Sequence, residues 1–427
     1  MNAPFSTPVW ENLGRGRVQT QSLRRAETVD LVVVGAGIQG LSTALHAARR
    51  GLSVRVLEAG LVGAGASSLN GGQVIPGLKY DPDWLLATFG ERPGQRLIDF
   101  ASSTADAVFD LIRSEALDVA HSRNGWIQAA HTEAALSAAH ARDLQWRARG
   151  ADVAMLDAAE IAAMTGAAGY LGGWLDRRAG VIDPLGYTLG LAGAAIRAGA
   201  AIAEHQKVEA LRRSGDRWIA TTESGAQISA GKVVVATNAY SDGLIPGLAE
   251  TIVPLHSFQI ATAPLSRDQA ESILPGGQAV SDSRRILVYY RKSPDGRLML
   301  GGRGRLALPR SASDWTHLEH ALIRLYPSLR GVPVQQRWFG RVAMTPDHLP
   351  HIHEPEKGLI AAVGCQGRGL GLMTSLGARL ADYVVDDDRD SLPFPVTPIR
   401  PIPFHRFHKL GVAATIAWYR TLDRLGR

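Results

Sequence analysis

Short apolar runs that end at glycine-rich turns dominate the first part of this chain. Residues 31–34 form a continuous apolar run, which is typical of a strand buried in a parallel sheet. A glycine-rich turn follows, and the next segment has helical apolar periodicity through Ala48 before Gly51 ends it. Residues 54–57 form a second apolar run. This strand–helix–strand order predicts an α/β domain with a doubly wound parallel sheet.

Apolar patterns further along the chain predict more strands of this parallel sheet and a second, antiparallel sheet. Residues 232–236 and 358–363 are further buried-strand runs, and the second of them enters a glycine-rich turn at 364–371. Residues 286–291 and 298–303 flank an Asp-Gly turn and read as a hairpin of an antiparallel sheet. The fold class expected is therefore α/β within one domain and α+β overall.

The composition indicates a large folded core. Of 427 residues, 45% are hydrophobic and 20% are charged, which excludes disordered and fibrous chains. The longest apolar run near either end, 411–418, is shorter than the roughly 20 residues that a spanning helix needs. Residues 1–28 lack the apolar core of a signal peptide, so we expect a cytoplasmic protein. Cys365 is the only cysteine, which excludes an internal disulfide and a zinc site built on thiolates.

Positive charge is concentrated at the C-terminus. The net charge is +6, and the segment from Pro398 onward carries six basic residues against one acidic residue. The rest of the chain is close to neutral, so we expect no nucleic-acid partner. Residues 391–427 read as a Pro-rich linker and a basic amphipathic helix. That helix either docks on the body or lies on the inner face of an anionic membrane.

A dinucleotide fingerprint lies in the first glycine-rich turn. Gly35 permits the tight turn, Gly37 lets the backbone approach a pyrophosphate, and Gly40 lets the helix pack on the strand. Glu58 ends the second strand, where a carboxylate accepts the ribose hydroxyls and disfavours NADP. The alternative is a turn that serves packing alone. The residues expected to bind the cofactor here are Gly35, Gly37, Ile38, Gln39, Gly40, Glu58 and Ala59.

A second loop of small residues follows soon after Glu58. An extended flavin dinucleotide has use for such a loop beside its pyrophosphate and ribityl chain, whereas a nicotinamide enzyme does not. An ordinary surface loop is the alternative. The candidate FAD-binding residues in this loop are Gly65, Ala66, Ser67, Asn70, Gly71, Gly72 and Gln73.

From Asp30 onward the chain resembles the D-amino-acid-oxidase (DAO) superfamily of FAD enzymes, in the branch of gamma-glutamylputrescine oxidase and L-pipecolate oxidase. The branch motif Gly-Ala-Ser-Gly-Arg-Asn-Gly-Gly appears at 65–72, with Ser68 in place of the second glycine and Leu69 in place of the arginine. The resemblance implies a Rossmann-like FAD domain of the glutathione-reductase type and an antiparallel substrate sheet over the flavin. It assigns 28–88, 160–240 and 336–390 to the FAD domain, and 89–159 and 241–335 to the substrate domain.

The resemblance also extends the set of cofactor residues. Sarcosine oxidases attach FAD through a cysteine where this chain has Gly340, so the FAD is expected to be non-covalent. The loop at 364–371 would face the flavin N1/O2 edge with a helix N-terminus. The further residues implied are Val208, Thr237, Asn238, Gly364, Gly367, Arg368, Gly369, Leu370 and Gly371.

The activity implied is oxidation of the C–N bond of an amino acid or secondary amine to an imine, by hydride transfer to flavin N5. Cyclic imino acids such as L-pipecolate or proline are candidate substrates, and electrons would pass to O2 or to a quinone. Gamma-glutamylputrescine oxidase is the alternative enzyme. A flavin-dependent tRNA-modification protein is the alternative of another class, against which the near-neutral body argues. The oligomeric state stays open.

Arginine is the most informative residue type for the substrate site. Arg341 is the favoured carboxylate anchor, because that region carries the carboxylate-binding arginine in amino-acid oxidases of the family. The lysine that sarcosine oxidases use is replaced by Gly371. Arg368 lies in the flavin-edge loop, and Tyr290 and Arg291 lie on the predicted hairpin.

One hypothesis for the three closely spaced histidines His348, His351 and His353 is a metal site. Pro350 breaks any helical ligand face, so we expect no metal. His351 is expected to pack in a loop near the flavin. The catalytic candidates are thus Arg341, Arg368, Tyr290, Arg291 and His351.

Overall fold

The computed structural model describes residues 7–14, 16–23, 26–284 and 286–424. Its first sheet is built on the continuous apolar runs. Strand β1 (Ala26–Val34) lies between β2 (Val54–Leu57) and β12 (Gln227–Val235) and is parallel to both. All of β2 and the last four residues of β1 are buried, as expected for strands covered on both faces.

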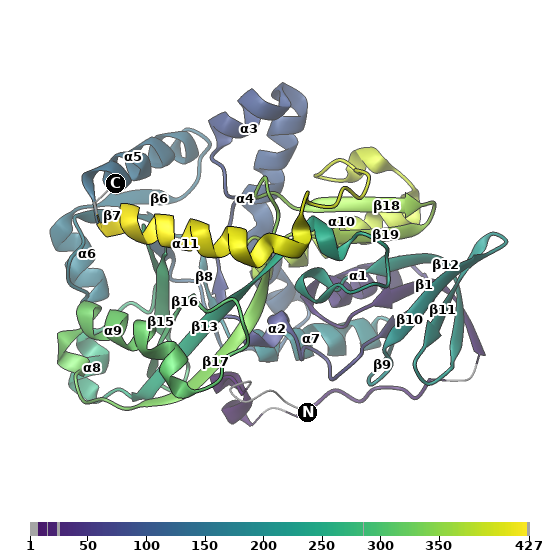
Figure 1. The fold of residues 1–427 in the computed structure, drawn as a ribbon, viewed down its shortest axis with the longest axis horizontal. Helices are drawn as coiled ribbons and strands as arrows, with labels where there is room; N and C mark the ends of the chain where they lie inside the picture. The colour runs from purple at the N-terminus through teal and green to yellow at the C-terminus, as the bar shows by residue number, and fades with distance from the viewer. Residues whose placement is uncertain (1–6, 15, 24–25, 285, 425–427) are drawn as a thin grey trace.

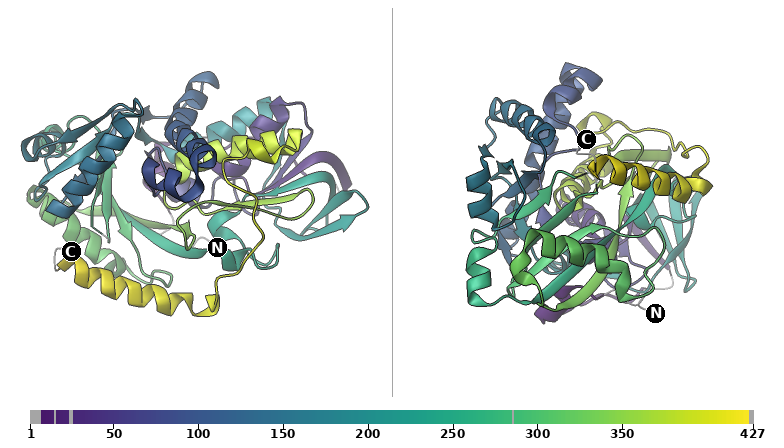
Figure 2. Two further views of the ribbon diagram at one scale, coloured as in Figure 1. Left: turned by 90° about the horizontal axis from the view of Figure 1, so that it is seen from above. Right: turned by 60° about the vertical axis from the view of Figure 1, so that its left-hand side comes forward.

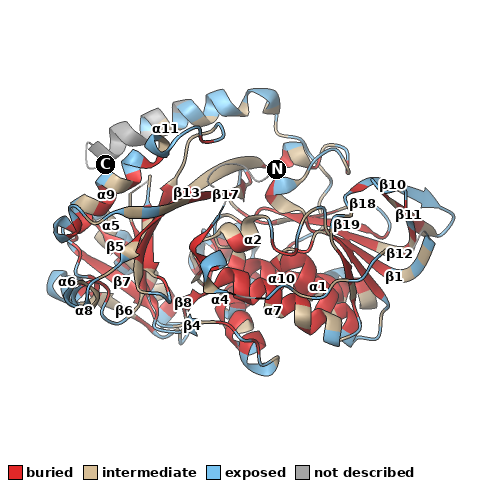
Figure 3. Ribbon diagram, turned by 90° about the horizontal axis from the view of Figure 1, so that it is seen from below, coloured by how far each residue is buried: buried red, intermediate tan, exposed pale blue. Residues whose placement is uncertain are grey.

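Further strands extend this sheet, and helices lie beside it (Figure 1). Helix α1 (Ile38–Arg49) contacts α7 (Pro184–Arg197) and α10 (Gly369–Asp386), and α10 also packs on α4 (Glu91–Ser114). Figure 3 shows these helices as a buried group beside the sheet. The parallel additions are β9 (Ala201–Ala203), which pairs with β2, and β19 (Leu359–Val363), which pairs with β12. The antiparallel additions are β10 (Val208–Ser214), β11 (Arg217–Thr222) and β18 (His351–Glu356), the last of which pairs with β19.

The second eight-stranded sheet is antiparallel except for one parallel pair, β14 with β5. Helices cover its outer face, and the apolar side chains between them form a second core. In sheet order its strands are β17 (Val334–Met344), β13 (Val253–Pro264), β16 (Arg297–Arg303), β15 (Val288–Lys292), β14 (Ala279–Asp282), β5 (Trp126–Ala130), β7 (Gly172–Asp176) and β6 (Val153–Leu156). The helices of this half are α5 (Glu133–Arg147), α6 (Ala158–Thr165), α8 (Arg267–Ser272) and α9 (Thr316–Leu325).

A small three-stranded sheet lies where the two halves meet. It consists of β3 (Gln73–Val74), β8 (Gly180–Ile182) and β4 (His121–Ser122). Helix α2 (Ala66–Leu69) precedes it, and α3 (Pro82–Phe89) follows.

The strands divide between the sheets differently from the domain ranges expected from sequence. Strands β7 and β17 fall in ranges assigned to the FAD domain, yet both belong to the antiparallel sheet. β17 pairs with β13 from Val253↔Met344 to Thr262↔Val334. An apolar pattern predicts that a strand is buried but does not name its partner, so the boundary near 336 was placed by resemblance and misses this pairing.

The C-terminal segment runs along the outside of the molecule. Val396 pairs with Ile352, and the Ile402 N–H donates to the Glu250 carbonyl. Helix α11 (His408–Arg424) then passes over the antiparallel half (Figure 1, Figure 2). Residues 425–427 of the expected tail lie outside the described residues. Within the described part of the chain, none of the helices has the length and apolar character needed to cross a bilayer.

Arg291 on β15 connects the antiparallel sheet to the other half. Its Nη1 donates to the carbonyls of Gly72 and Ile182 at 2.8 and 2.7 Å, and its guanidinium lies 5.3 Å from the ring centre of Trp10. The side chain is buried, and burial lowers its pKa to about 9, so it stays charged at neutral pH. Arg291 is therefore a structural brace.

Replacing Arg291 by Met should destabilise the fold. The change leaves two buried carbonyls without their charged donor, which costs about 3 kcal/mol of unfolding free energy. The measurement is denaturant unfolding. The matched control is Arg267→Met, because Arg267 is 89% exposed and pairs only with Glu271 one turn away on α8. Equal stability of the two variants would contradict the bracing role.

Candidate active site

A cavity of about 1050 Å³ lies between the two large sheets. The loops that follow β1, β2, β12 and β19 line one side of it, at the carboxyl ends of these parallel strands. The inner face of the antiparallel sheet lines the other side. Ligands of open α/β sheets bind at this edge.

The first glycine turn forms one end of the cavity. Gly35 has a φ of 105°, which favours glycine. A Cβ on Gly37 would lie 2.8 Å from Ser67 Oγ, so this backbone is accessible only because the residue is glycine. A Cβ on Gly40 would collide with the Gly35 carbonyl, so Gly40 serves helix packing. The Glu58 carboxylate accepts the Ala36 N–H at 2.7 Å and the Gly60 N–H at 2.9 Å.

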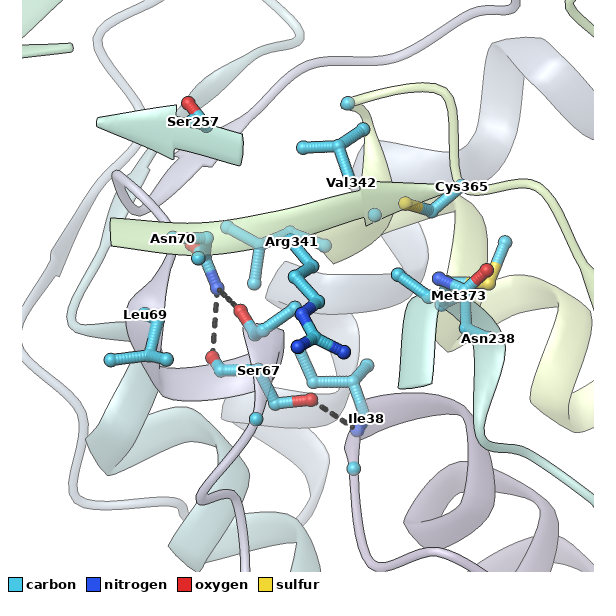
Figure 4. Close-up of a pocket in the computed structure, with 18 of the residues that line it drawn as sticks. Ile38, Ser67, Leu69, Asn70, Asn238, Ser257, Arg341, Val342, Cys365 and Met373 are labelled. Atoms are coloured by element: carbon cyan, nitrogen blue, oxygen red, sulfur yellow. Dashed lines mark hydrogen bonds between the residues drawn. The ribbon is translucent and has the colours of Figure 1, made fainter. Parts of the chain in front are cut away.

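The second loop is held against the first by its own polar groups. Ser67 Oγ accepts the Ile38 N–H at 3.0 Å, at the start of α1 (Figure 4). Asn70 Nδ2 donates to the Ala66 and Ser67 carbonyls, and its Oδ1 accepts the Gly72 N–H. The loop therefore presents small side chains and a helix N-terminus to the cavity, which suits an anionic pyrophosphate.

Gln39 provides a further test of fit for a dinucleotide. Gln39 is in the lining of the cavity and is 4% exposed, and its buried side-chain amide has no hydrogen-bond partner among the described protein groups. A buried amide of this kind usually has a partner. This unpartnered amide therefore fits a polar cofactor, as the two glycine-rich loops do.

Most of the cofactor residues expected from sequence line the cavity. Gly40, Gly72, Gly364 and Gly371 do not. A Cβ on Gly371 would lie 2.8 Å from the Thr104 carbonyl, so this glycine lets α10 approach α4. Those in the lining are Gly35, Gly37, Ile38, Gln39, Glu58, Ala59, Gly65, Ala66, Ser67, Asn70, Gly71, Gln73, Val208, Thr237, Asn238, Gly367, Arg368, Gly369 and Leu370.

Tyr290 lies on the wrong face of β15 for its expected catalytic role. It is fully buried in the second core and its hydroxyl contacts the hydroxyl of Tyr170. Its neighbour Tyr289 lines the cavity, and the Tyr289 hydroxyl lies 2.7 Å from Ser257 Oγ. Burial raises the pKa of Tyr289 to about 12, so it remains a proton donor at neutral pH.

Two other catalytic candidates also lie outside the cavity lining. Arg291 braces Gly72 and Ile182, as described above. His351 begins β18, where Nε2 contacts the Asp347 carboxylate at 3.0 Å. Its neighbour His348 lines the cavity instead. Within the described residues no group of three His, Cys, Asp or Glu side chains is arranged to hold a metal ion.

Three cations gather at the other end of the cavity. Lys79, Arg142 and Arg368 line it together with Trp126 and Gln128, and we call these three the cation cluster. Arg368 donates to the Pro76 carbonyl at 2.7 Å and lies 5.7 Å from the Trp126 ring centre. Burial lowers the pKa of Arg368 to about 10, with a smaller contribution from Arg142.

The cation cluster has one directly paired acid. Asp81 pairs with Arg142 through two hydrogen bonds of 2.8 and 3.1 Å. No carboxylate of the described residues lies within ion-pair distance of Lys79 or Arg368. Burial, and then the charges of Arg368 and Arg142, lower the pKa of Lys79. Lys79 and Arg142 were not predicted from the sequence as site residues, because only the fold brings these distant positions beside Arg368.

Arg341 lines the cavity from β17 but points toward the dinucleotide end. Its guanidinium lies 5.2 Å from the ring centre of Tyr240, and in Figure 4 it is directed toward Ser67 and Ile38. The assignment of Arg341 as carboxylate anchor was made from sequence position, and this direction does not favour it.

Comparisons with known proteins identify the family of this chain. Residues 30–383 match the sequence profile of the FAD dependent oxidoreductase family, DAO. The chain is 30% identical to the gamma-glutamylputrescine oxidoreductase of Escherichia coli, over 95% of both chains. It is also 30% identical to a probable oxidoreductase OrdL of Rhizobium meliloti, over 92% of both.

Solved structures agree in fold. Glycine oxidase from Geobacillus kaustophilus superposes with a TM-score of 0.74, at 23% identity, covering 87% of this chain and 99% of that one. L-proline dehydrogenase from P. horikoshii gives a TM-score of 0.70 at 19% identity, covering 87% of this chain and 100% of that one. The family resemblance, the two-sheet fold class and FAD as cofactor are thereby confirmed. The chain belongs to the DAO family of FAD-dependent oxidoreductases.

Proposed function

We propose that this enzyme oxidises the C–N bond of an amine that carries a carboxylate, such as an amino acid or an imino acid. The observation that carries this proposal is the cation cluster, which faces the cavity with one directly paired acid. The flavin, when bound, accepts a hydride from the carbon beside the amine. The protein's part is to bind the carboxylate, orient that carbon and exclude water.

The charge balance at the cation cluster favours an anion. Asp81 neutralises Arg142, which leaves Arg368 and Lys79 as the cations that a substrate carboxylate would meet. The planar guanidinium of Arg368 suits a carboxylate through paired hydrogen bonds. Burial, and then repulsion by the two neighbouring cations, lowers the pKa of Lys79, and a bound anion would relieve that repulsion.

Polar groups on the antiparallel sheet are suited to the amine. Tyr289 lines the cavity and stays protonated at neutral pH, whereas the Asp282 side chain is fully buried. Asp282 accepts from Arg284 at 2.6 Å and from the Val288 N–H at 3.0 Å, and burial raises its pKa. We infer that Tyr289 orients the amine while the cluster holds the carboxylate, and that the buried Asp282 has a structural role.

Substrate candidates follow from the relatives and remain proposals. Gamma-glutamylputrescine carries its carboxylate at the glutamyl end, remote from the terminal amine of the putrescine part, and a cyclic imino acid carries one beside the reacting carbon. Both would use the cation cluster, but at different distances from the flavin. Oxygen and a quinone remain the two candidate acceptors. The cations lie inside the cavity, which gives no support to a tRNA substrate.

The outer face of α11 supports peripheral membrane contact as a second proposal. Phe407, Leu410 and Trp418 are 49%, 69% and 60% exposed. Leu410 and Trp418 recur at helical spacing along one face of α11, and Phe407 directly precedes the helix, while Val412 and Ile416 are half-buried. Arg406 and Lys409 are exposed beside this apolar stripe. An anionic bilayer surface matches both the stripe and the charge.

The purified protein should be yellow and should release intact FAD when the polypeptide is precipitated with acid. Gly340 offers no side chain for a covalent link, and the buried Cys365 lies against the Ala343 carbonyl. Flavin content is read by absorbance in the supernatant and in the pellet. Flavin that stays with the pellet would contradict non-covalent binding.

Removing the cation cluster should weaken the binding of carboxylated substrates selectively. Arg368→Met should raise the Kd measured from anaerobic flavin reduction by roughly 10²-fold, from the loss of charge-assisted hydrogen bonds. The decarboxylated amine of the same skeleton should be unaffected, since it has nothing for Arg368 to hold. Lys292→Met is the control, because Lys292 donates outside the cavity, to the Ala270 carbonyl.

Lys79 adds a pH dependence to the same measurement. Lys79 favours binding in its charged form, so binding should weaken as pH rises through its pKa, which is lowered from 10.5. Lys79→Met should remove this alkaline loss. Equal Kd values for the parent and both variants, at every pH, would place the carboxylate site elsewhere.

The double variant Leu410→Ser/Trp418→Ser should reduce co-sedimentation with anionic vesicles at low salt. Burying a large apolar side chain contributes roughly 1.5–3 kcal/mol, so partitioning should fall by at least 10-fold. Leu144→Ser is the control, because Leu144 is 69% exposed on α5. Two results would contradict the membrane proposal: a parent protein that ignores the vesicles, or a variant that changes only the oligomeric state.

A further inference from the structure

Arg341 occupies a place in the cavity that the proposed chemistry does not use. It comes from β17 of the antiparallel sheet, yet in Figure 4 its guanidinium is directed toward Ser67 and Ile38. These two residues belong to the two glycine loops of the other half. Ile38 N is a backbone donor at the start of α1, and Ser67 Oγ accepts its hydrogen bond.

Tyr240 fixes this position of the guanidinium. One side of the Tyr240 ring lies close to Gly65, where an added Cβ would be 3.1 Å from the ring. The Arg341 guanidinium lies 5.2 Å from the ring centre, a distance that permits a cation–π contact. The Tyr240 ring thus contacts both Gly65 and the Arg341 guanidinium, which places this cation beside the second glycine loop.

The charge of Arg341 has no matching acid nearby. No carboxylate among the described residues lies within ion-pair distance of it. The acids that line this end are Glu58, which accepts two backbone N–H groups, and Asp242, which faces Lys207 at 3.9 Å. A cation facing a helix N-terminus without an acid indicates an anionic ligand between them.

We propose that Arg341 is a cofactor residue: its guanidinium binds the pyrophosphate of FAD from the side opposite the N-terminus of α1. The antiparallel sheet then contributes a charged contact to a dinucleotide otherwise held by the parallel sheet. The inference concerns the cofactor alone, so it stands whichever amine is the substrate. It replaces the role of carboxylate anchor that the sequence suggested for Arg341.

The test measures how fast FAD leaves the holoenzyme. After dilution, free FAD is followed by its fluorescence, which rises when the flavin leaves the protein. Arg341→Met should release FAD about 10- to 100-fold faster than the parent, because charge-assisted hydrogen bonds to the pyrophosphate are lost. Arg341→Lys keeps the charge and should fall between the two. Raising the salt concentration should narrow the difference.

Arg337→Met is the matched control on the same strand. Arg337 pairs with Glu319 at 2.6 Å and does not line the cavity, so its loss should leave FAD release unchanged. Thermal unfolding of each variant separates a folding defect from a binding defect, and Arg341→Lys remains informative if Arg341→Met folds poorly.

One pattern of results would overturn the inference. If Arg341→Met and Arg341→Lys keep FAD as long as the parent does, Arg341 does not bind the pyrophosphate. A raised Kd for carboxylated substrates in the same variants would then restore the substrate role. Faster FAD release, with no change in the substrate Kd of the flavin-loaded fraction, supports the inference even if no tested amine reduces the flavin.

Discussion

The structure depends on the hydrogen bonds that the antiparallel sheet donates to backbone carbonyls of the second glycine loop. Gln259 on β13 and Trp338 on β17 both donate to the Leu69 carbonyl, at 2.8 and 3.2 Å. Arg291 on β15 holds the Gly72 carbonyl from the same sheet. These bonds attach the substrate sheet to the backbone of the loop that follows Glu58. The distance between the cofactor cleft and the substrate end is therefore set by buried hydrogen bonds and not by a flexible linker.

The cavity is electrostatically divided along its length. The end near α1 offers backbone N–H groups and Arg341, whereas the other end offers Arg368 and Lys79 beside Trp126. The pyrophosphate of a dinucleotide and the carboxylate of an amino acid are both anionic groups, so each needs positive charge in a site that excludes water.

The cofactor half could be predicted from sequence because its signals are local. Gly35, Gly37 and Gly40 lie within six residues, and the strand before them and the acid after them follow at fixed spacing. The substrate half could not be predicted to the same depth, because its residues meet only through sheet pairing. Tyr289 and Tyr290 are adjacent in sequence and point to opposite faces, so a shift of one residue changed a cavity residue into a core residue.

One signal for the correct tyrosine was present in the strand pairing. Tyr289 pairs with Gly301, and a Cβ on Gly301 would overlap the tyrosine ring, so the glycine makes room for it. Such a pair of glycine and aromatic residues could have identified the cavity side of the hairpin once the register was known. Lys79 and Arg142 carry no such signal. Their meeting with Arg368 depends on the packing of α5 and the loop before α3.

The most direct test of the account is anaerobic reduction of the bound flavin in the unmodified enzyme. Pairs of amino acids and their decarboxylated amines, together with cyclic imino acids and gamma-glutamyl amines, would be mixed with the holoenzyme in single turnovers. If the enzyme oxidises carboxylated amines, at least one of them should bleach the flavin rapidly, and its decarboxylated partner should do so far more weakly. Equal bleaching by both members of every pair would contradict it, as would a flavin that no amine reduces.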